Sequence, residues 1–169
     1  MNFLTPVLLI FYFLLFVFLV WFSGFFFGAP FESTVKKRVK KMIEFSNVNK
    51  NEKVVDLGSG SGKIVIEFAK KGIESHGYEI NPFLVWISRR KIKKLFLQDK
   101  AFIHRKNFMK ENLSNYDVVF IFQIWYIMSK LKRKLKKELK KGSRIISNTW
   151  KFPNWKPKKQ SKGVYLYEV

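Results

Sequence analysis

The stretch that decides the fold is VVDLGSGSGK, residues 54–63, which places three glycines within five residues directly behind an apolar run. The run predicts a buried strand. The glycines allow the backbone that follows it to come close to a ligand. ATP, NAD and S-adenosylmethionine are three adenosine-containing ligands that such a loop can hold, and the residues around the glycines distinguish them.

The glycine spacing disfavours the first two ligands. A P-loop for ATP reads G-x-x-x-x-G-K-[ST]. Here Gly58 and Gly62 stand one residue too close together, and Ile64 replaces the hydroxyl residue. The dinucleotide fingerprint reads G-x-G-x-x-G, and Lys63 occupies the position of its third glycine. S-adenosylmethionine is therefore the ligand that the loop predicts.

From residue 53 onward, short apolar runs alternate with helical patterns, which predicts a mostly parallel, doubly wound α/β sheet of the Rossmann type. Ligands of such sheets bind beyond the carboxyl ends of the strands, where the glycine loop falls. The expected strands are 53–57, 75–79, 101–104, 117–122, 144–147 and an edge strand 163–169. The expected helices are 63–71, 82–97 and 127–141, and the last ends before Gly142, a residue suited to a left-handed cap.

The N-terminal residues predict a membrane anchor over 1–30. The run 3–27 carries no charged side chain and is long enough to span a hydrocarbon core as a helix. No Lys or Arg precedes it, and VKKRVKK follows at 35–41, so the positive-inside rule places the later residues in the cytoplasm. Residues 31–52 are expected to form an amphipathic basic helix and a linker before the domain at 53–169.

Composition narrows the chemistry. The chain has no cysteine and two histidines, so no metal site is expected. Its formal net charge is +21, from 33 Lys and Arg against 12 Asp and Glu. Such a charge suits an anionic partner such as nucleic acid or an acidic membrane face. An AT-rich genome would raise the lysine content equally well, so the charge alone does not identify a partner.

Asp56 before the glycines and Glu79 at the end of the second expected strand resemble the first motif and the ribose-binding acid of class I methyltransferases. Longer segments resemble the ATP synthase c-subunit lysine methyltransferase family and its prokaryotic relatives. They are VVDLGSGSGKIVIEFA, GYEINPFLVWISRRK, NFMKENLSNYDVVFIF, KLKKELKKGSRII and FPNWKP. The resemblance implies a class I methyltransferase fold, S-adenosylmethionine as cofactor and a protein lysine as substrate. The cofactor-binding residues it implies are Asp56, Gly58, Ser59, Gly60, Gly62, Glu79, Asn81, Asn107 and Phe108.

The methyl acceptor is expected on the side of the fourth and fifth strands. Aromatic faces can hold an alkylammonium group by cation–π contact, although the same rings also suit core packing. Candidate catalytic residues are Gln123, Trp125 and Tyr126, and candidate substrate-binding residues are Trp150, Phe152, Pro153 and Trp155. The segment 123–126 lacks the [DN]-P-P-[YF] motif of enzymes that methylate base amines. Methylation of RNA, a small molecule or a lipid remains an alternative, as does a non-catalytic, membrane-tethered cofactor-binding domain.

Overall fold

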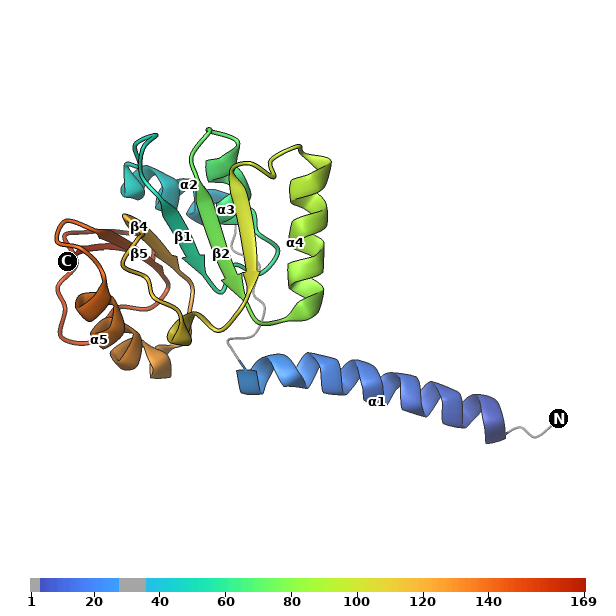
Figure 1. Ribbon diagram of the computed structural model, residues 1–169. Coiled ribbons are helices and arrows are strands. Elements are labelled where there is room, and N and C mark those ends of the chain that lie inside the picture. The colour runs from blue at the N-terminus through green and yellow to red at the C-terminus, as the bar shows by residue number, and fades with distance from the viewer. Residues whose placement is uncertain (1–3, 28–35) are drawn as a thin grey trace. The chain divides into compact units, whose positions relative to one another are not determined.

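The computed structural model describes residues 4–27 and 36–169 (Figure 1). The chain divides into two compact units, Met1–Glu32 and Ser33–Val169. The first contains helix α1, Leu4–Phe27, whose large apolar side chains from Leu8 to Val20 are between 40% and 70% exposed. Within the described residues, no helix meets the length and hydropathy of a membrane span. The transmembrane helix predicted over 1–30 is therefore not confirmed.

The second unit is built on a seven-stranded sheet with the order β3-β2-β1-β4-β5-β7-β6. Strands β1 to β5 pair in parallel, and β7 pairs antiparallel with both of its neighbours. The strands are Val54–Leu57 (β1), Ser75–Glu79 (β2), Ala101–Arg105 (β3), Val118–Ile121 (β4), Arg144–Asn148 (β5), Lys159–Ser161 (β6) and Val164–Glu168 (β7). The mostly parallel, doubly wound sheet is confirmed. The expectation that 163–169 forms an edge was wrong, because β6 occupies the edge and β7 lies inside it.

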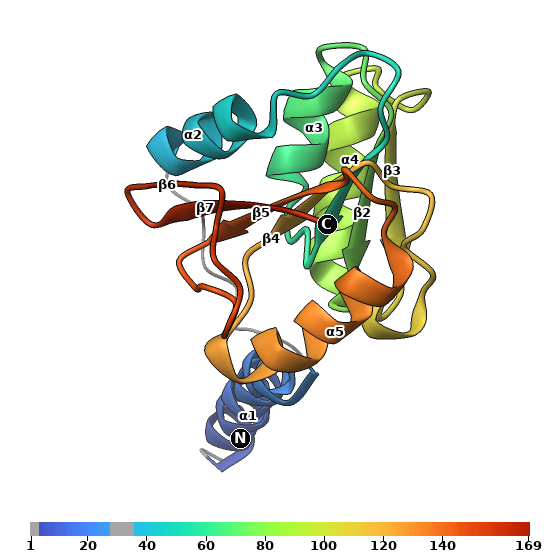
Figure 2. The ribbon, with the colours of Figure 1, turned by 90° about the vertical axis from the view of Figure 1, so that its left-hand side faces the viewer.

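Helices cover both faces of this sheet (Figure 2). One face carries α2 (Lys36–Ser46), α3 (Lys63–Ala69) and α4 (Pro82–Lys94), and the other carries α5 (Met128–Glu138). Because side chains alternate along a strand, Val54 packs under α2 and α3 while Val55 packs under α5. Two short 3-10 helices, η1 (Phe108–Lys110) and η2 (Trp125–Ile127), follow β3 and β4. The first turns of the predicted basic helix, 31–35, lie outside the described residues.

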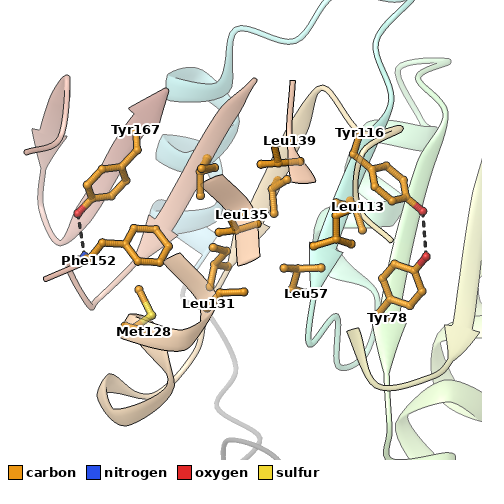
Figure 3. Packing of buried hydrophobic residues seen from close by; sticks show 14 residues of the cluster. Leu57, Tyr78, Leu113, Tyr116, Met128, Leu131, Leu135, Leu139, Phe152 and Tyr167 are labelled. Carbon is orange, nitrogen blue, oxygen red and sulfur yellow. Dashed lines mark hydrogen bonds between the residues drawn. The ribbon is translucent and has the colours of Figure 1, made fainter. Parts of the chain in front are cut away.

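The core on the α5 face is dense in aromatic and leucine side chains (Figure 3). Leu131 and Leu135 of α5 are fully buried, and their spacing of four residues places both on the side of the helix that faces the sheet. At one end of this core the hydroxyls of Tyr78 and Tyr116 lie 3.2 Å apart. The core thereby fixes the positions of β1, β2 and β4, whose carboxyl ends form the site.

Candidate functional site

The glycine loop follows β1 and turns sharply into α3. Gly58, Gly60 and Gly62 all have left-handed backbone angles, with φ of 84°, 53° and 76°, which glycine adopts without strain. At Gly58 an added Cβ would also displace the side-chain amide of Gln123, which lies against the loop. The loop therefore presents bare backbone at the centre of the carboxyl edge of the sheet, as the sequence predicted.

Glu79 at the end of β2 holds this loop in place. Its Oε2 accepts a hydrogen bond from the backbone N–H of Gly60 at 2.9 Å, and its Oε1 accepts one from the N–H of Asn81 at 2.8 Å. The side chain is only 9% exposed. Each carboxylate oxygen retains a second lone pair, so Glu79 can still accept hydrogen bonds from a ligand's hydroxyl groups.

Asp56, the last residue but one of β1, is a second buried carboxyl group and is 7% exposed. Burial, together with the nearby charge of Glu79, raises the pKa of Asp56 from 3.8 to about 7. Desolvation disfavours the charged form of a carboxyl group, and a like charge adds to that effect. A bound cation or bound hydrogen-bond donors would therefore stabilise the ionised form of Asp56.

Ser59 brings a buried polar side chain into the loop. It is 6% exposed, and its hydroxyl has no hydrogen-bond partner among the described residues. The loop presses closely on β2 here, since a Cβ added at Gly77 would lie 2.6 Å from the Ser59 hydroxyl oxygen. A buried hydroxyl without a partner costs free energy that a bound polar molecule would recover. These features fit an adenosyl cofactor.

The three remaining predicted cofactor residues have structural roles as well. The side-chain oxygen of Asn81 caps α4 by accepting from the N–H of Phe83 at 3.0 Å, and that of Asn107 caps η1 by accepting from Met109 at 3.0 Å. Phe108 is partly buried against the core on the α5 face. Asn81 follows β2 and Asn107 follows β3, so they flank the carboxyl edge. The capping roles were not predicted from the sequence.

The acceptor-side candidates after β4 divide into one buried and two exposed residues. Gln123 is 6% exposed, and its side-chain amide donates to the carbonyl of Leu57 at 2.9 Å, which ties β4 to the start of the glycine loop. Trp125 and Tyr126 are 67% and 56% exposed, and their rings meet edge to face at 5.9 Å. Gln123 therefore positions the loop, while the two rings offer an open aromatic surface.

The C-terminal candidates are not brought together at the surface. Trp150, which follows β5, is 41% exposed. Phe152 is buried in the core on the α5 face, where its ring lies 5.3 Å from Trp155 and 5.0 Å from Tyr167. Pro153 is exposed, and its carbonyl accepts from Lys132 at 2.7 Å. Core packing therefore accounts for Phe152, and Trp150 is the ring that remains accessible at the sheet edge.

Asn148, the last residue of β5, is a polar residue at this edge that the sequence analysis missed. It is fully buried, and neither polar atom of its amide has a partner within the described part of the chain. An unpaired buried amide is rare in a folded protein, and it costs free energy at this edge of the sheet. The signal in the sequence is one asparagine at the end of the strand RIISN.

Residues 56–159 match the family model described as the ANTKMT methyltransferase domain. The human ATP synthase c-subunit lysine N-methyltransferase is 35% identical over 128 residues, which cover 76% of this chain and 54% of the relative. The chain thus spans about half the length of that relative. A protein-lysine N-methyltransferase of Saccharolobus islandicus (strain REY15A) is 33% identical over 151 residues, which cover 83% of this chain and 94% of the relative.

A similar solved structure is an RNA methyltransferase from Salinibacter ruber in complex with S-adenosyl-L-homocysteine. It superposes with a TM-score of 0.79 at 26% identity and covers 82% of this chain and 94% of that one. A methyltransferase from Thiobacillus denitrificans, also in complex with S-adenosyl-L-homocysteine, gives a TM-score of 0.61 at 18% identity. The fold is therefore that of S-adenosylmethionine-dependent methyltransferases.

The raised pKa of Asp56 makes stability depend on pH. Between about pH 4 and pH 7 the folded state keeps a proton on Asp56 that the unfolded state has lost, so this group makes the protein less stable as pH rises. Asp56→Asn should remove that loss. By pH 7 the free energy of unfolding of this variant should exceed that of the original protein by up to about 4 kcal/mol. Urea unfolding of the full chain in neutral detergent, without cofactor, measures the difference. Asp99→Asn is the exposed control, and a constant difference across the pH range would contradict the raised pKa.

Proposed function

This chain belongs to the ANTKMT methyltransferase domain family, and on that premise we propose that it is an S-adenosylmethionine-dependent protein-lysine N-methyltransferase. The observation that carries the proposal is the glycine loop held to β2 by Glu79, with the unpaired hydroxyl of Ser59 in it. The archaeal relative named as a protein-lysine N-methyltransferase aligns over nearly its whole length, which supports the lysine substrate.

The residues that would hold the cofactor lie at the ends of β1 and β2. Glu79 can accept hydrogen bonds from the two ribose hydroxyls, and the bare backbone around Gly58 and Gly60 permits close contact with the rest of the molecule. When bound, S-adenosylmethionine supplies a methyl group on a sulfonium that is already activated for transfer. The protein therefore needs to align the acceptor and exclude water.

The acceptor amine would be received by the aromatic rings at the ends of β4 and β5. Trp125, Tyr126 and Trp150 are exposed, and these two strands are neighbours in the sheet. Aromatic faces attract an alkylammonium group, which brings a lysine side chain to the carboxyl edge. Transfer requires the neutral amine, because an ammonium group has no lone pair with which to attack the methyl group. No separate nucleophile is needed for this reaction.

Replacing Glu79 tests the cofactor site. Glu79→Gln keeps the shape but places an amide N–H₂ opposite one of the two backbone N–H groups and removes the charge that the ribose hydroxyls would meet. We expect affinity for S-adenosylhomocysteine to fall about tenfold or more, because a hydrogen bond to a charged group is replaced. Isothermal titration of the full chain in neutral detergent measures it, with Glu168→Gln as control. A chain that binds no cofactor at all would reject the methyltransferase proposal and leave only a tethered domain with this fold.

RNA is the second candidate substrate, favoured by the Salinibacter ruber structure and by the net charge of +21. A basic surface binds phosphate backbones without regard to sequence. Against this candidate, the segment after β4 reads Gln-Ile-Trp-Tyr at 123–126 and lacks the motif that receives an exocyclic base amine. The lysine proposal is therefore preferred, and the destination of the methyl group separates the two.

Transfer of a labelled methyl group identifies the substrate class. The full chain is incubated with tritiated S-adenosylmethionine and a membrane extract of its source, and protein, RNA and lipid fractions are counted separately. We expect label in a protein band that yields methyllysine after acid hydrolysis, and we expect Glu79→Gln to reduce it at least tenfold at limiting cofactor. Label that follows RNA or lipid would reject the lysine substrate while leaving the methyltransferase activity intact.

We further propose that residues 1–30 tether the domain to a membrane and that the domain faces the cytoplasm. The run 3–27 is uncharged, α1 is helical over 24 residues, and its described apolar side chains are exposed. Leaving such a surface in water is unfavourable. A tether would raise the local concentration of a membrane-embedded substrate.

A reporter enzyme fused after Val169 tests the tether and its orientation. In cells we expect a reporter that requires the cytoplasm to be active, and we expect the fusion to stay in the membrane pellet after alkaline carbonate. Deletion of residues 1–30 should move the fusion to the supernatant. Activity of an exported reporter at the same position would reverse the orientation, and carbonate release of the intact fusion would exclude a spanning helix.

A further inference from the structure

A groove with a volume of about 760 Å³ lies among α2, α3 and α4, apart from the acids of the cofactor site. Neither Asp56, Ser59 nor Glu79 lines it, although Ser61 of the glycine loop forms part of its wall. Its apolar lining is contributed by all three helices, with Val39 and Ile43 from α2, Ile66 from α3 and Leu95 at the end of α4. The volume is that of a small-molecule site rather than a gap between side chains.

The rest of the lining is strongly basic. Five lysines line the groove against one acid, Glu67, which itself pairs with Lys70 at 3.3 Å. Lys40, Lys91 and Lys94 have no described carboxylate within 4.0 Å. The lining lysines are Lys40, Lys63, Lys71, Lys91 and Lys94. Cations gathered around one cavity repel one another, so an anion bound there is favoured.

We propose that this groove binds an anionic phospholipid, with the acyl chain against the apolar lining and the phosphate among the lysines. A phospholipid combines the two properties that the groove displays, an apolar body and a negative head. An acidic protein segment could pair with the lysines but would not fill an apolar cavity of this size. The groove is lined by helices and the glycine loop, so it offers no strand edge with which a peptide could pair. Lipid binding here does not depend on the cofactor site.

The test uses the full chain in neutral detergent micelles and titrates it with dioctanoyl phosphatidylglycerol or with the matched phosphatidylcholine. The lipid bound to the protein is measured by native mass spectrometry. We expect phosphatidylglycerol to bind about tenfold more tightly, because each lysine near an anionic headgroup adds to affinity. Lys91→Gln with Lys94→Gln should weaken its binding about tenfold. Lys130→Gln with Lys137→Gln removes the same charge from exposed positions of α5 and should change it less than twofold.

The apolar lining has its own matched pair. Leu95→Ser should weaken both lipids, while Phe96→Ser, which changes the neighbouring and 88% exposed side chain outside the groove, should weaken neither. If the lysine substitutions in α4 and in α5 weaken lipid binding equally, the effect is one of net charge and the proposal is overturned. The proposal is also overturned if a decaglutamate peptide binds more tightly than the lipid and loses affinity when the α4 lysines are replaced, because the groove would then bind an acidic protein. Retained lipid binding in the Glu79→Gln variant keeps this result separate from the proposed methyl transfer.

Discussion

The bridge made by Glu79 is the interaction on which the site depends. One carboxylate joins the N–H of Gly60 to the N–H of Asn81, so it fastens the glycine loop to the start of α4. Glycine restricts φ so little that such a loop needs several fixed points. The carbonyl of Tyr78 accepts hydrogen bonds from the N–H groups of Gly58 and Ser59 at 2.9 and 3.0 Å, and the amide of Gln123 donates to the carbonyl of Leu57. The cradle is thus formed by the chain itself before any ligand arrives.

The same carboxylate also affects a buried neighbour. Burial raises the pKa of Asp56 toward neutrality, and the charge of Glu79 adds to that effect. A protein that keeps two acids in one buried region gives up stability there. Hydrogen-bond donors from a ligand would stabilise the negative charge. Among the described residues, the hydroxyl of Ser59 and the side-chain amide of Asn148 also lack hydrogen-bond partners. These unfavourable features lie where the strands end, which is where a methyltransferase fold does its chemistry.

Sequence reasoning was sufficient where local chemistry dictates local structure. Residues 75–79 were expected as a strand and form β2 with those bounds. Gly142 has the expected left-handed φ of 88°, but the prediction that it caps the helix was wrong, because α5 ends at Glu138 with Leu139 as its C-cap. Prediction from sequence failed where contacts with residues distant in the chain determine the structure. Strand β6 is three polar residues without alternation, so only its pairing with β7 reveals it. Phe152 could equally have lain at a site or in the core, and its contact with Tyr167 decides in favour of the core. Asn81 and Asn107 were interpreted as cofactor-binding residues, so the helix-capping role of their side-chain oxygens was not predicted.

The insertion of β7 between β5 and β6 has a consequence for how the domain assembles. Helix α2, the first element of the second unit, packs on β5 and β7, and β7 is made of the final residues of the chain. Arg144 of β5 likewise reaches back to the carbonyl of Asn47. Contacts with such long separations in sequence are slow to form because the intervening loop must close first. During synthesis α2 therefore emerges about a hundred residues or more before these strands do, and its apolar face is covered only when β5 and β7 have been made.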